Sequence, residues 1–193
     1  MEENKLNAVR VVAIGGSAGS LQIVLKIVPL LSPGMNVCVI LVMHRKSNED
    51  NVLSDVISAR TGLRVREIED KDAIEAGVIF LAPPDYHVLL EKDGTFTLDD
   101  SEKVHFSRPS IDVTFESVAE VCRENLICVL LSGANSDGAE GLRTARALGA
   151  TIVIQDPDTA DVPYMPKQAM EIVEPDMLLS ESNLIDFVDL VNR

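Results

Sequence analysis

The chain has 193 residues, of which 46% are hydrophobic and 25% charged, so it is long and apolar enough to fold around a buried core. Its 17 Lys and Arg residues face 31 Asp and Glu residues, which gives a formal net charge of −14. This acidity argues against nucleic acid as a partner, because a phosphate backbone is bound by clustered cations. The sequence has no apolar run of about 18 residues and no signal-peptide pattern, so we expect no direct membrane insertion.

The chain contains three cysteines, Cys38, Cys122 and Cys128. Their number is odd, none forms a Cys-x-x-Cys pair, and each lies in or beside an apolar run. We therefore expect reduced core residues in a cytoplasmic protein.

The hydrophobic pattern predicts strands and helices that alternate along the chain. A strand over 9–14 is followed by a helix over 21–31, a strand over 37–43, a helix over 52–60 and a strand over 78–81. Two further strands, 86–90 and 95–98, flank Asp93-Gly94, a sequence typical of a two-residue hairpin turn. The remaining expected elements are a helix over 111–121, a strand over 126–131, a helix over 138–148, a strand over 151–154 and a helix over 184–191.

This alternation predicts an α/β fold with a doubly wound, mostly parallel sheet, helices on both faces and a β-hairpin insertion. The insertion is expected within the acidic stretch 68–105. We expect a single domain over 1–193, with its core at about 9–191. In such sheets ligands bind beyond the carboxyl ends of the strands, so residues directly after strands are the candidates for chemistry.

The loop Gly15-Gly16-Ser17-Ala18-Gly19 follows the first strand. Its glycines do not fit the Gly-x-Gly-x-x-Gly spacing of a dinucleotide loop, and no Gly-Lys-Ser/Thr follows as a Walker loop requires. Two interpretations remain. The loop matches Gly-x-Ser-x-Gly, a strand–helix turn that exposes a nucleophilic serine, or Ser17 only caps the next helix.

A nucleophilic serine needs a base and an acid that orients it. His44 is the best placed of the three histidines, because it directly follows the second strand, whose end should adjoin that of the first. Asp137 follows a later strand at the same edge. With Glu140 three residues on, Asp137 also fits a capping box for its own helix, and the sequence alone leaves both roles open.

Several blocks, in the same order along residues 9–190, resemble the catalytic domain of the CheB-type chemotaxis protein-glutamate methylesterases. They include Ser17, His44 and Asp137 and read as follows: Val12–Gly19, Leu41–His44, Ile79–His87, His105–Asp112, Leu130–Gly133, Asp137–Gly141, Gln155-Asp156 and Met165-Pro166.

The resemblance implies a hydrolase with Ser17 as nucleophile, His44 as general base and acid, and Asp137 as its orienting partner. It implies hydrolysis of γ-glutamyl methyl esters on the cytoplasmic helices of methylated chemoreceptors, with deamidation of receptor glutamines in some members. Ala18, Ala134 and Met165 are the expected oxyanion or substrate contacts. We expect Nε2 of His44 to face Ser17 and Nδ1 to face Asp137, and we expect no metal and no cofactor.

The resemblance also exposes differences from the family pattern. Only about eight residues precede the first strand, where family members usually carry a receiver domain, so a separate regulatory protein is a possible partner. Asn135 stands where the aspartate loop usually has glycine, and Tyr164 stands where glycine is usual before Met165-Pro166. Arg45-Lys46 follows His44 and could keep the base neutral or attract acidic receptor helices, unless both side chains only face solvent.

The two remaining histidines and the block after His105 have weaker assignments. We expect His87 and His105 to serve in hydrogen bonding or packing. Ser110 is expected to cap the helix over 111–121, with Asp112 in its first turn, and Arg108 shares this structural interpretation. Substrate contact is the alternative for Arg108, Ser110 and Asp112. The main functional alternatives are a serine esterase of similar fold that acts on a small ester, and a regulatory module without catalysis.

Overall fold

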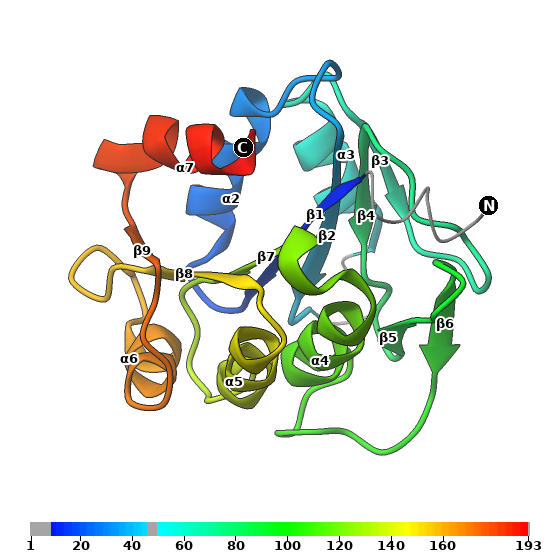
Figure 1. The fold of residues 1–193 in the computed structure, drawn as a ribbon. Coiled ribbons are helices and arrows are strands. Elements are labelled where there is room, and N and C mark those ends of the chain that lie inside the picture. The colour runs from blue at the N-terminus through cyan, green and yellow to red at the C-terminus, as the bar shows by residue number, and fades with distance from the viewer. Residues whose placement is uncertain (1–8, 46–49, 193) are drawn as a thin grey trace.

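The computed structural model describes residues 9–45 and 50–192, and its centre is a seven-stranded sheet (Figure 1). The strand order is β3-β4-β2-β1-β7-β8-β9, and every neighbouring pair is parallel. The strands are β1 (Arg10–Gly16), β2 (Val37–Met43), β3 (Arg64–Glu67), β4 (Val78–Leu81), β7 (Leu126–Leu130), β8 (Thr151–Gln155) and β9 (Met177–Leu179). The mostly parallel sheet predicted from the sequence is confirmed.

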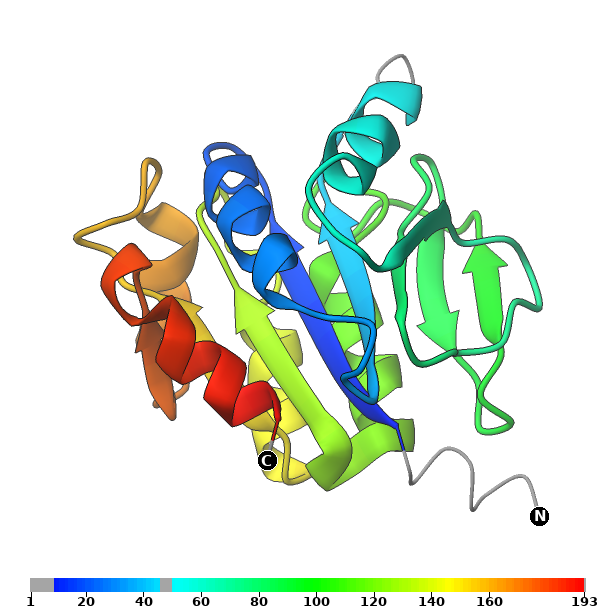
Figure 2. The same ribbon diagram turned by 90° about the horizontal axis from the view of Figure 1, so that it is seen from above.

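Helices cover both faces of the sheet, as Figure 1 shows. One face carries α2 (Leu21–Ile27), α3 (Asp50–Ser58) and α7 (Leu184–Val191), and Figure 2 looks onto this layer. The other face carries α4 (Ile111–Cys122), α5 (Ala139–Ala147) and α6 (Tyr164–Met170). Short 3-10 turns at Val28–Leu30, Arg123–Asn125 and Glu181–Asn183 adjoin α2, α4 and α7.

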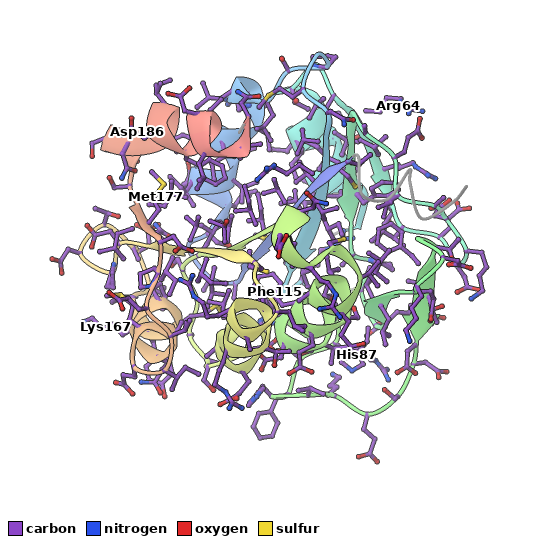
Figure 3. The ribbon with its side chains drawn as sticks, in the orientation of Figure 1. Arg64, His87, Phe115, Lys167, Met177 and Asp186 are labelled. Carbon is purple, nitrogen blue, oxygen red and sulfur yellow. The ribbon has the colours of Figure 1, made fainter. Side chains whose placement is uncertain are left out.

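The central strands are continuous apolar runs because both of their faces are buried. All seven residues of β2 are buried, and the side chains of β1 alternate between the two helical layers. Figure 3 labels Phe115, a fully buried side chain of α4 in the layer between that helix and the sheet. Cys38, Cys122 and Cys128 are free and buried, as expected for core residues.

The hairpin forms a separate two-stranded antiparallel sheet of β5 (His87–Leu90) and β6 (Phe96–Asp99). It lies at the end of the molecule opposite α7 (Figure 2). Two expectations need correction. The Glu91 N–H donates to the Thr95 carbonyl at 2.8 Å, so the bend takes residues 92–94, one more than predicted. The range 68–105 also contains β4, a strand of the main sheet, so the insertion is narrower than expected.

Three elements were not predicted, and each has a weak sequence signal. β3 reads Arg-Val-Arg-Glu and β9 has only three residues, and both are edge strands without a long apolar run. α6 contains Pro166, which a helix tolerates only in its first turn. Within the described residues, no helix has the length and apolarity needed to cross a membrane.

The topology places the ends of three adjacent strands together. The order of strands reverses at β1, which has β2 on one side and β7 on the other. Gly16 at the end of β1 pairs in register with Met43 at the end of β2, and Gly15 pairs with Leu130 at the end of β7. Residues that directly follow β1, β2 and β7 therefore meet at the reversal of strand order, where α/β sheets bind their ligands.

Candidate active site

Ser17 is the first residue after β1, and its backbone is fixed from the side of β7. Its N–H donates to the Ser132 carbonyl at 2.9 Å, and the Ser132 hydroxyl donates to the Ala18 carbonyl at 2.8 Å. The turn ends at Gly19, whose φ of +80° is a conformation that favours glycine. An added Cβ there would lie 2.6 Å from Cβ of Asp161. The position therefore requires glycine, and the loop presents a half-buried Ser17 side chain at the edge of the sheet.

The helix-cap interpretation of Ser17 is wrong. The residue before α2 is Ser20, whose hydroxyl donates to the Ser17 carbonyl at 2.6 Å. No hydrogen bond joins the Ser17 hydroxyl to another of the described residues. The side chain is therefore free of a structural role in helix capping.

His44 lies beside Ser17 on the neighbouring strand end. The register that pairs Gly16 with Met43 continues by one residue, and the His44 N–H donates to the Gly16 carbonyl at 3.1 Å. Neighbouring strands are roughly 4.8 Å apart, so Ser17 and His44 are lateral neighbours. Both line a cavity of about 440 Å³, whose other lining side chains are mostly apolar and come from the start of α2, from β2 and from α3.

The His44 ring contacts Asp137, which follows β7. Nε2 of His44 lies 2.8 Å from Oδ2 of Asp137, and the His44 side chain is 13% exposed. The structure thus brings this sequence-predicted pair together across the end of β1. The ring has the opposite orientation to the expected one, since Nε2 and not Nδ1 faces the acid. Nδ1 is therefore the ring nitrogen available to the rest of the site.

Asp137 is fully buried and accepts hydrogen bonds from a neighbouring helix. Its Oδ1 accepts from the Ser110 hydroxyl at 2.9 Å and from the Asp112 N–H at 3.0 Å, and its Oδ2 accepts from the Ile111 N–H at 2.8 Å. Burial alone would raise the pKa of Asp137, but the hydrogen bonds from His44 and from the two N–H groups outweigh it and lower the pKa. The carboxylate is therefore ionised at neutral pH and accepts a hydrogen bond from the N–H group at Nε2 of His44.

The capping box predicted for Asp137 and Glu140 is also wrong. α5 begins after Gly138, and Glu140 instead pairs with Arg143 on the surface. Asp137 caps α4, a helix that begins 26 residues upstream, while Ser110 is the N-cap residue of α4 as predicted.

Asp112 makes the reciprocal contact from α4 to α5. Its Oδ1 accepts from the Gly141 N–H in the first turn of α5 at 2.6 Å, and Nε2 of His105 lies 3.2 Å from its Oδ2. Burial and the nearby charge of Asp137 raise the pKa of Asp112 to about 6, although Gly141 and His105 lower it in part. Each helix N-terminus is thus held by a carboxylate that the other segment supplies.

Ser107 and Asn135 complete the surroundings of His44, and the sequence did not single out Ser107 as a site residue. Oγ of Ser107 lies 3.4 Å from Nδ1 of His44, and Nδ2 of Asn135 donates to that Oγ at 3.4 Å. Oδ1 of Asn135 accepts from the Asp137 N–H at 3.2 Å. The only available signal was the position of Ser107 two residues after His105 and directly before Arg108-Pro109.

The three expected oxyanion or substrate contacts differ in what they can offer. Ala18 and Ala134 are exposed, and neither N–H donates a hydrogen bond within the described part of the chain, although neither residue is among those that line the cavity. Met165 is fully buried, and its N–H already donates to the Gly133 carbonyl at 3.0 Å. An added Cβ on Gly133 would lie 2.4 Å from Cε of Met165 and 3.1 Å from Cβ of Ser17, so the Met165 side chain packs on the Ser17 side of Gly133, although Met165 is not among the residues that line the cavity.

Of the two cations that follow His44, the structure describes the contacts of Arg45 only. The Arg45 side chain is 5% exposed, pairs with Glu67 and donates to the Ala82 carbonyl, so it does not simply face solvent. Glu67 offsets its charge at this position. Lys46 lies outside the described residues.

Arg108 and His87 make hydrogen bonds to the protein backbone. Arg108 donates to the carbonyls of Asp100 and Ser101, and His87 accepts from the Ser110 N–H at 3.1 Å. Tyr164 is half-exposed at the start of α6 and is not among the residues that line the Ser17–His44 cavity. Among the described residues, no group of three His, Cys, Asp or Glu side chains is placed to hold a metal ion.

Comparisons with known proteins identify relatives over most of the chain. The family model described as CheB methylesterase matches residues 12–188. A putative protein-glutamate methylesterase/protein-glutamine glutaminase of Leptospira interrogans is 40% identical over 169 residues, 88% of each chain. A protein-glutamate methylesterase/protein-glutamine glutaminase of Symbiobacterium thermophilum is 34% identical over 84% of this chain, but the match spans only 45% of that relative.

The fold comparison points to the same family. The crystal structure of the Thermotoga maritima CheB methylesterase catalytic domain matches with a TM-score of 0.89 and 28% identity, covering 94% of this chain and 98% of that one. On the extent of the family-model match and the identity to these relatives, the chain belongs to the CheB methylesterase family.

Proposed function

We propose that the chain is a protein-glutamate methylesterase that hydrolyses γ-glutamyl methyl esters through Ser17, His44 and Asp137. The observation that carries the proposal is the 2.8 Å contact between His44 and a buried, ionised Asp137, formed across the end of the strand that carries Ser17. A hydroxyl, an imidazole and a carboxylate in this order are the groups that acyl transfer by a serine nucleophile requires.

In the first step the Ser17 hydroxyl attacks the ester carbonyl and gives its proton to His44. Because Nε2 carries the proton shared with Asp137, the accepting atom is Nδ1. The distance from Ser17 to the ring tightens when substrate is bound, since such hydrogen bonds are often loose in free enzymes. The N–H groups of Ala18 and Ala134 are the proposed donors to the oxyanion.

The tetrahedral intermediate then collapses and releases methanol. Nδ1 of His44 returns its proton to the departing methoxide, which leaves the glutamyl group esterified to Oγ of Ser17. A water molecule gives a proton to Nδ1 and attacks the acyl carbon, and the proton then returns to Ser17 as glutamate leaves. Attack on a glutamine side chain would follow the same steps with ammonia as the leaving group.

The proposed substrate is the methylated cytoplasmic helix of a chemoreceptor, and we accordingly place the protein in the cytoplasm. Relatives named for both the methylesterase and the glutaminase activity support this choice. A separate regulatory protein is a second proposed partner. The chain spans about half of some of these relatives, so the regulation of the longer proteins does not transfer directly.

The test measures methanol release from methylated receptor and from simple aryl esters. We expect release from the receptor and little turnover of aryl esters, whereas the reverse preference would favour an esterase for small molecules. A serine-directed phosphonate should form a stoichiometric adduct on Ser17. A folded protein that forms no adduct and releases no methanol would favour a regulatory module without catalysis.

A further inference from the structure

We propose that Ser107, held by Asn135, is a positioning residue for His44, an inference that rests on the hydrolysis proposed above. Four hydrogen-bonding contacts connect the side chains in a closed circuit. The His44 ring contacts the Asp137 carboxylate, and the Asp137 N–H donates to the Asn135 side chain. The Asn135 amide donates to the Ser107 hydroxyl, which in turn contacts the His44 ring. The circuit connects the loop before α4 to the loop after β7 through the proposed base.

The orientation of Asn135 decides what Ser107 can do. Because the Asp137 N–H can only donate, the atom of Asn135 that it meets is the carbonyl oxygen Oδ1. The amide nitrogen Nδ2 then lies 3.4 Å from Oγ of Ser107 and 3.5 Å from the His105 carbonyl, and since it can only donate, both oxygens accept from it. The Ser107 hydroxyl can therefore donate its own hydrogen bond to another acceptor.

Two acceptors lie at the same distance from the Ser107 hydroxyl. Nδ1 of His44 is 3.4 Å away, and the His105 carbonyl is also 3.4 Å away. As the base proposed above, His44 is a neutral ring with its proton on Nε2 toward Asp137, and Nδ1 then carries a lone pair. The hydroxyl can thus hold the ring at Nδ1 and then turn to the His105 carbonyl when Ser17 approaches, without losing a partner in either state.

The loop that carries Ser107 has an unusual backbone conformation just before this residue. His105 and Phe106 both have positive φ, at 48° and 62°, which is uncommon for consecutive residues other than glycine. The Phe106 side chain is 99% exposed, so the contacts to the site come from Ser107. The charged groups of the site are Asp137 on Nε2, the Asp112–His105 pair behind it, and Arg45 with Glu67.

The kinetic test compares Ser107→Ala, Asn135→Gly and the double variant. We expect Ser107→Ala to lower kcat for methylated receptor by about 3- to 10-fold, the value of one hydrogen bond, with KM unchanged. Asn135→Gly should lower kcat by less. Because Asn135 contacts the Asp137 backbone as well as Ser107, the double variant should be slower than Ser107→Ala, but by less than the product of the two single losses.

Two further variants separate positioning from a general effect on the loop. Ser107→Thr keeps the hydroxyl and should restore most of kcat. Ser101→Ala is the matched control, since Ser101 lies in the same segment and its hydroxyl contacts only Asp99 within the described residues. Unchanged or higher kcat in Ser107→Ala, or additive losses in the double variant, would overturn the proposal.

A spectroscopic arm keeps this inference distinct from the proposed function. Nitrogen NMR of the His44 ring reports the proton on Nε2 and the hydrogen bonding of Nδ1 without any turnover. We expect the Nδ1 resonance of Ser107→Ala to move toward that of an acceptor without a donor, and Ser107→Thr to restore it. A protein without esterase activity would defeat the proposed function alone, whereas an unmoved Nδ1 resonance would defeat the role of Ser107 alone.

Discussion

The two sides of the candidate site are built differently. On the acid side, Asp137 is fully buried and accepts three hydrogen bonds from the start of α4 in addition to the one from His44. On the nucleophile side, the backbone of Ser17 is held by Ser132, but its hydroxyl has no hydrogen-bond partner among residues 9–45 and 50–192 and borders a cavity of about 440 Å³. The difference teaches that Asp137, the proposed orienting acid, also supports the fold, whereas the hydroxyl of Ser17, the proposed nucleophile, makes no hydrogen bond among the described residues.

Replacement of the nucleophile gives the largest expected change and tests the open side. Ser17→Ala should lower kcat by at least about 10⁴-fold, because removal of a triad member in a serine hydrolase costs that much or more. The free energy of unfolding should stay within about 0.5 kcal/mol, because the Ser17 hydroxyl has no partner among the described residues. Methanol release and urea unfolding measure the two effects. Normal turnover by a folded Ser17→Ala protein would remove Ser17 from the mechanism.

Replacement of the acid tests the buried side and should change both quantities. Asp137→Ala leaves the Ser110 hydroxyl and the N–H groups at the start of α4 without their acceptor, so we expect a loss of about 2 to 4 kcal/mol in the free energy of unfolding. It should also lower kcat by about 10³-fold or more.

Glu140→Ala is the matched control for Asp137→Ala, since this exposed acid pairs only with the surface residue Arg143 among the described residues. Its stability should stay within about 0.5 kcal/mol of the wild type. Equal stability of the two variants in urea unfolding would show that the acid side is not a structural support.

Asp112 sharpens the comparison through pH. Its pKa is raised to about 6 in the folded protein, so the folded state holds a proton that the unfolded state releases between about pH 4 and pH 6. The carboxylate therefore disfavours folding above pH 6, and this cost disappears below about pH 4, where both states are protonated. Asp112→Asn should raise the free energy of unfolding by about 1 to 3 kcal/mol at pH 8 and by less at pH 5. A gain that does not depend on pH would contradict this account.

Arg45 lines the cavity beside Ser17, gives the smallest expected change and tests whether an ion pair supports the nucleophile side. Because Arg45 pairs with Glu67 and the Ala82 carbonyl, Arg45→Ala should lower stability by about 1 to 2 kcal/mol. The acidic limb of the pH–rate profile should not move. A shift of that limb to higher pH would instead assign Arg45 an electrostatic role at His44.

The sequence was informative where a residue's environment follows from its local pattern. The apolar runs of β1, β2 and β7 predicted buried strands, and adjacency of the first two predicted that Ser17 and His44 share an edge. The edge strand β3 has polar side chains because an edge is partly open to solvent, and the edge strand β9 has only three residues, too few to form a pattern. The helix α6 was also not predicted, because Pro166 is a residue that usually ends a helix.

The details of the site depended on contacts distant in sequence. The sequence around Asp137 fits a cap for the helix that follows it. In the structure, however, Asp137 accepts hydrogen bonds from the N–H groups of a helix that begins 26 residues upstream. The ring orientation of His44 and the contact from Ser107 likewise follow from how two loops meet. No spacing within either loop encodes that meeting.

The register between β1 and β2 has a consequence for protein engineering. Since pairing of Gly16 with Met43 sets the alignment of Ser17 and His44, the exposed connection over residues 32–34 can change in length without disturbing it. A single residue inserted inside either strand would shift one side chain by about 3.3 Å and turn it to the opposite face of the sheet. In an insertion scan we therefore expect esterase activity to survive insertions in the connection and to be lost with insertions inside the strands.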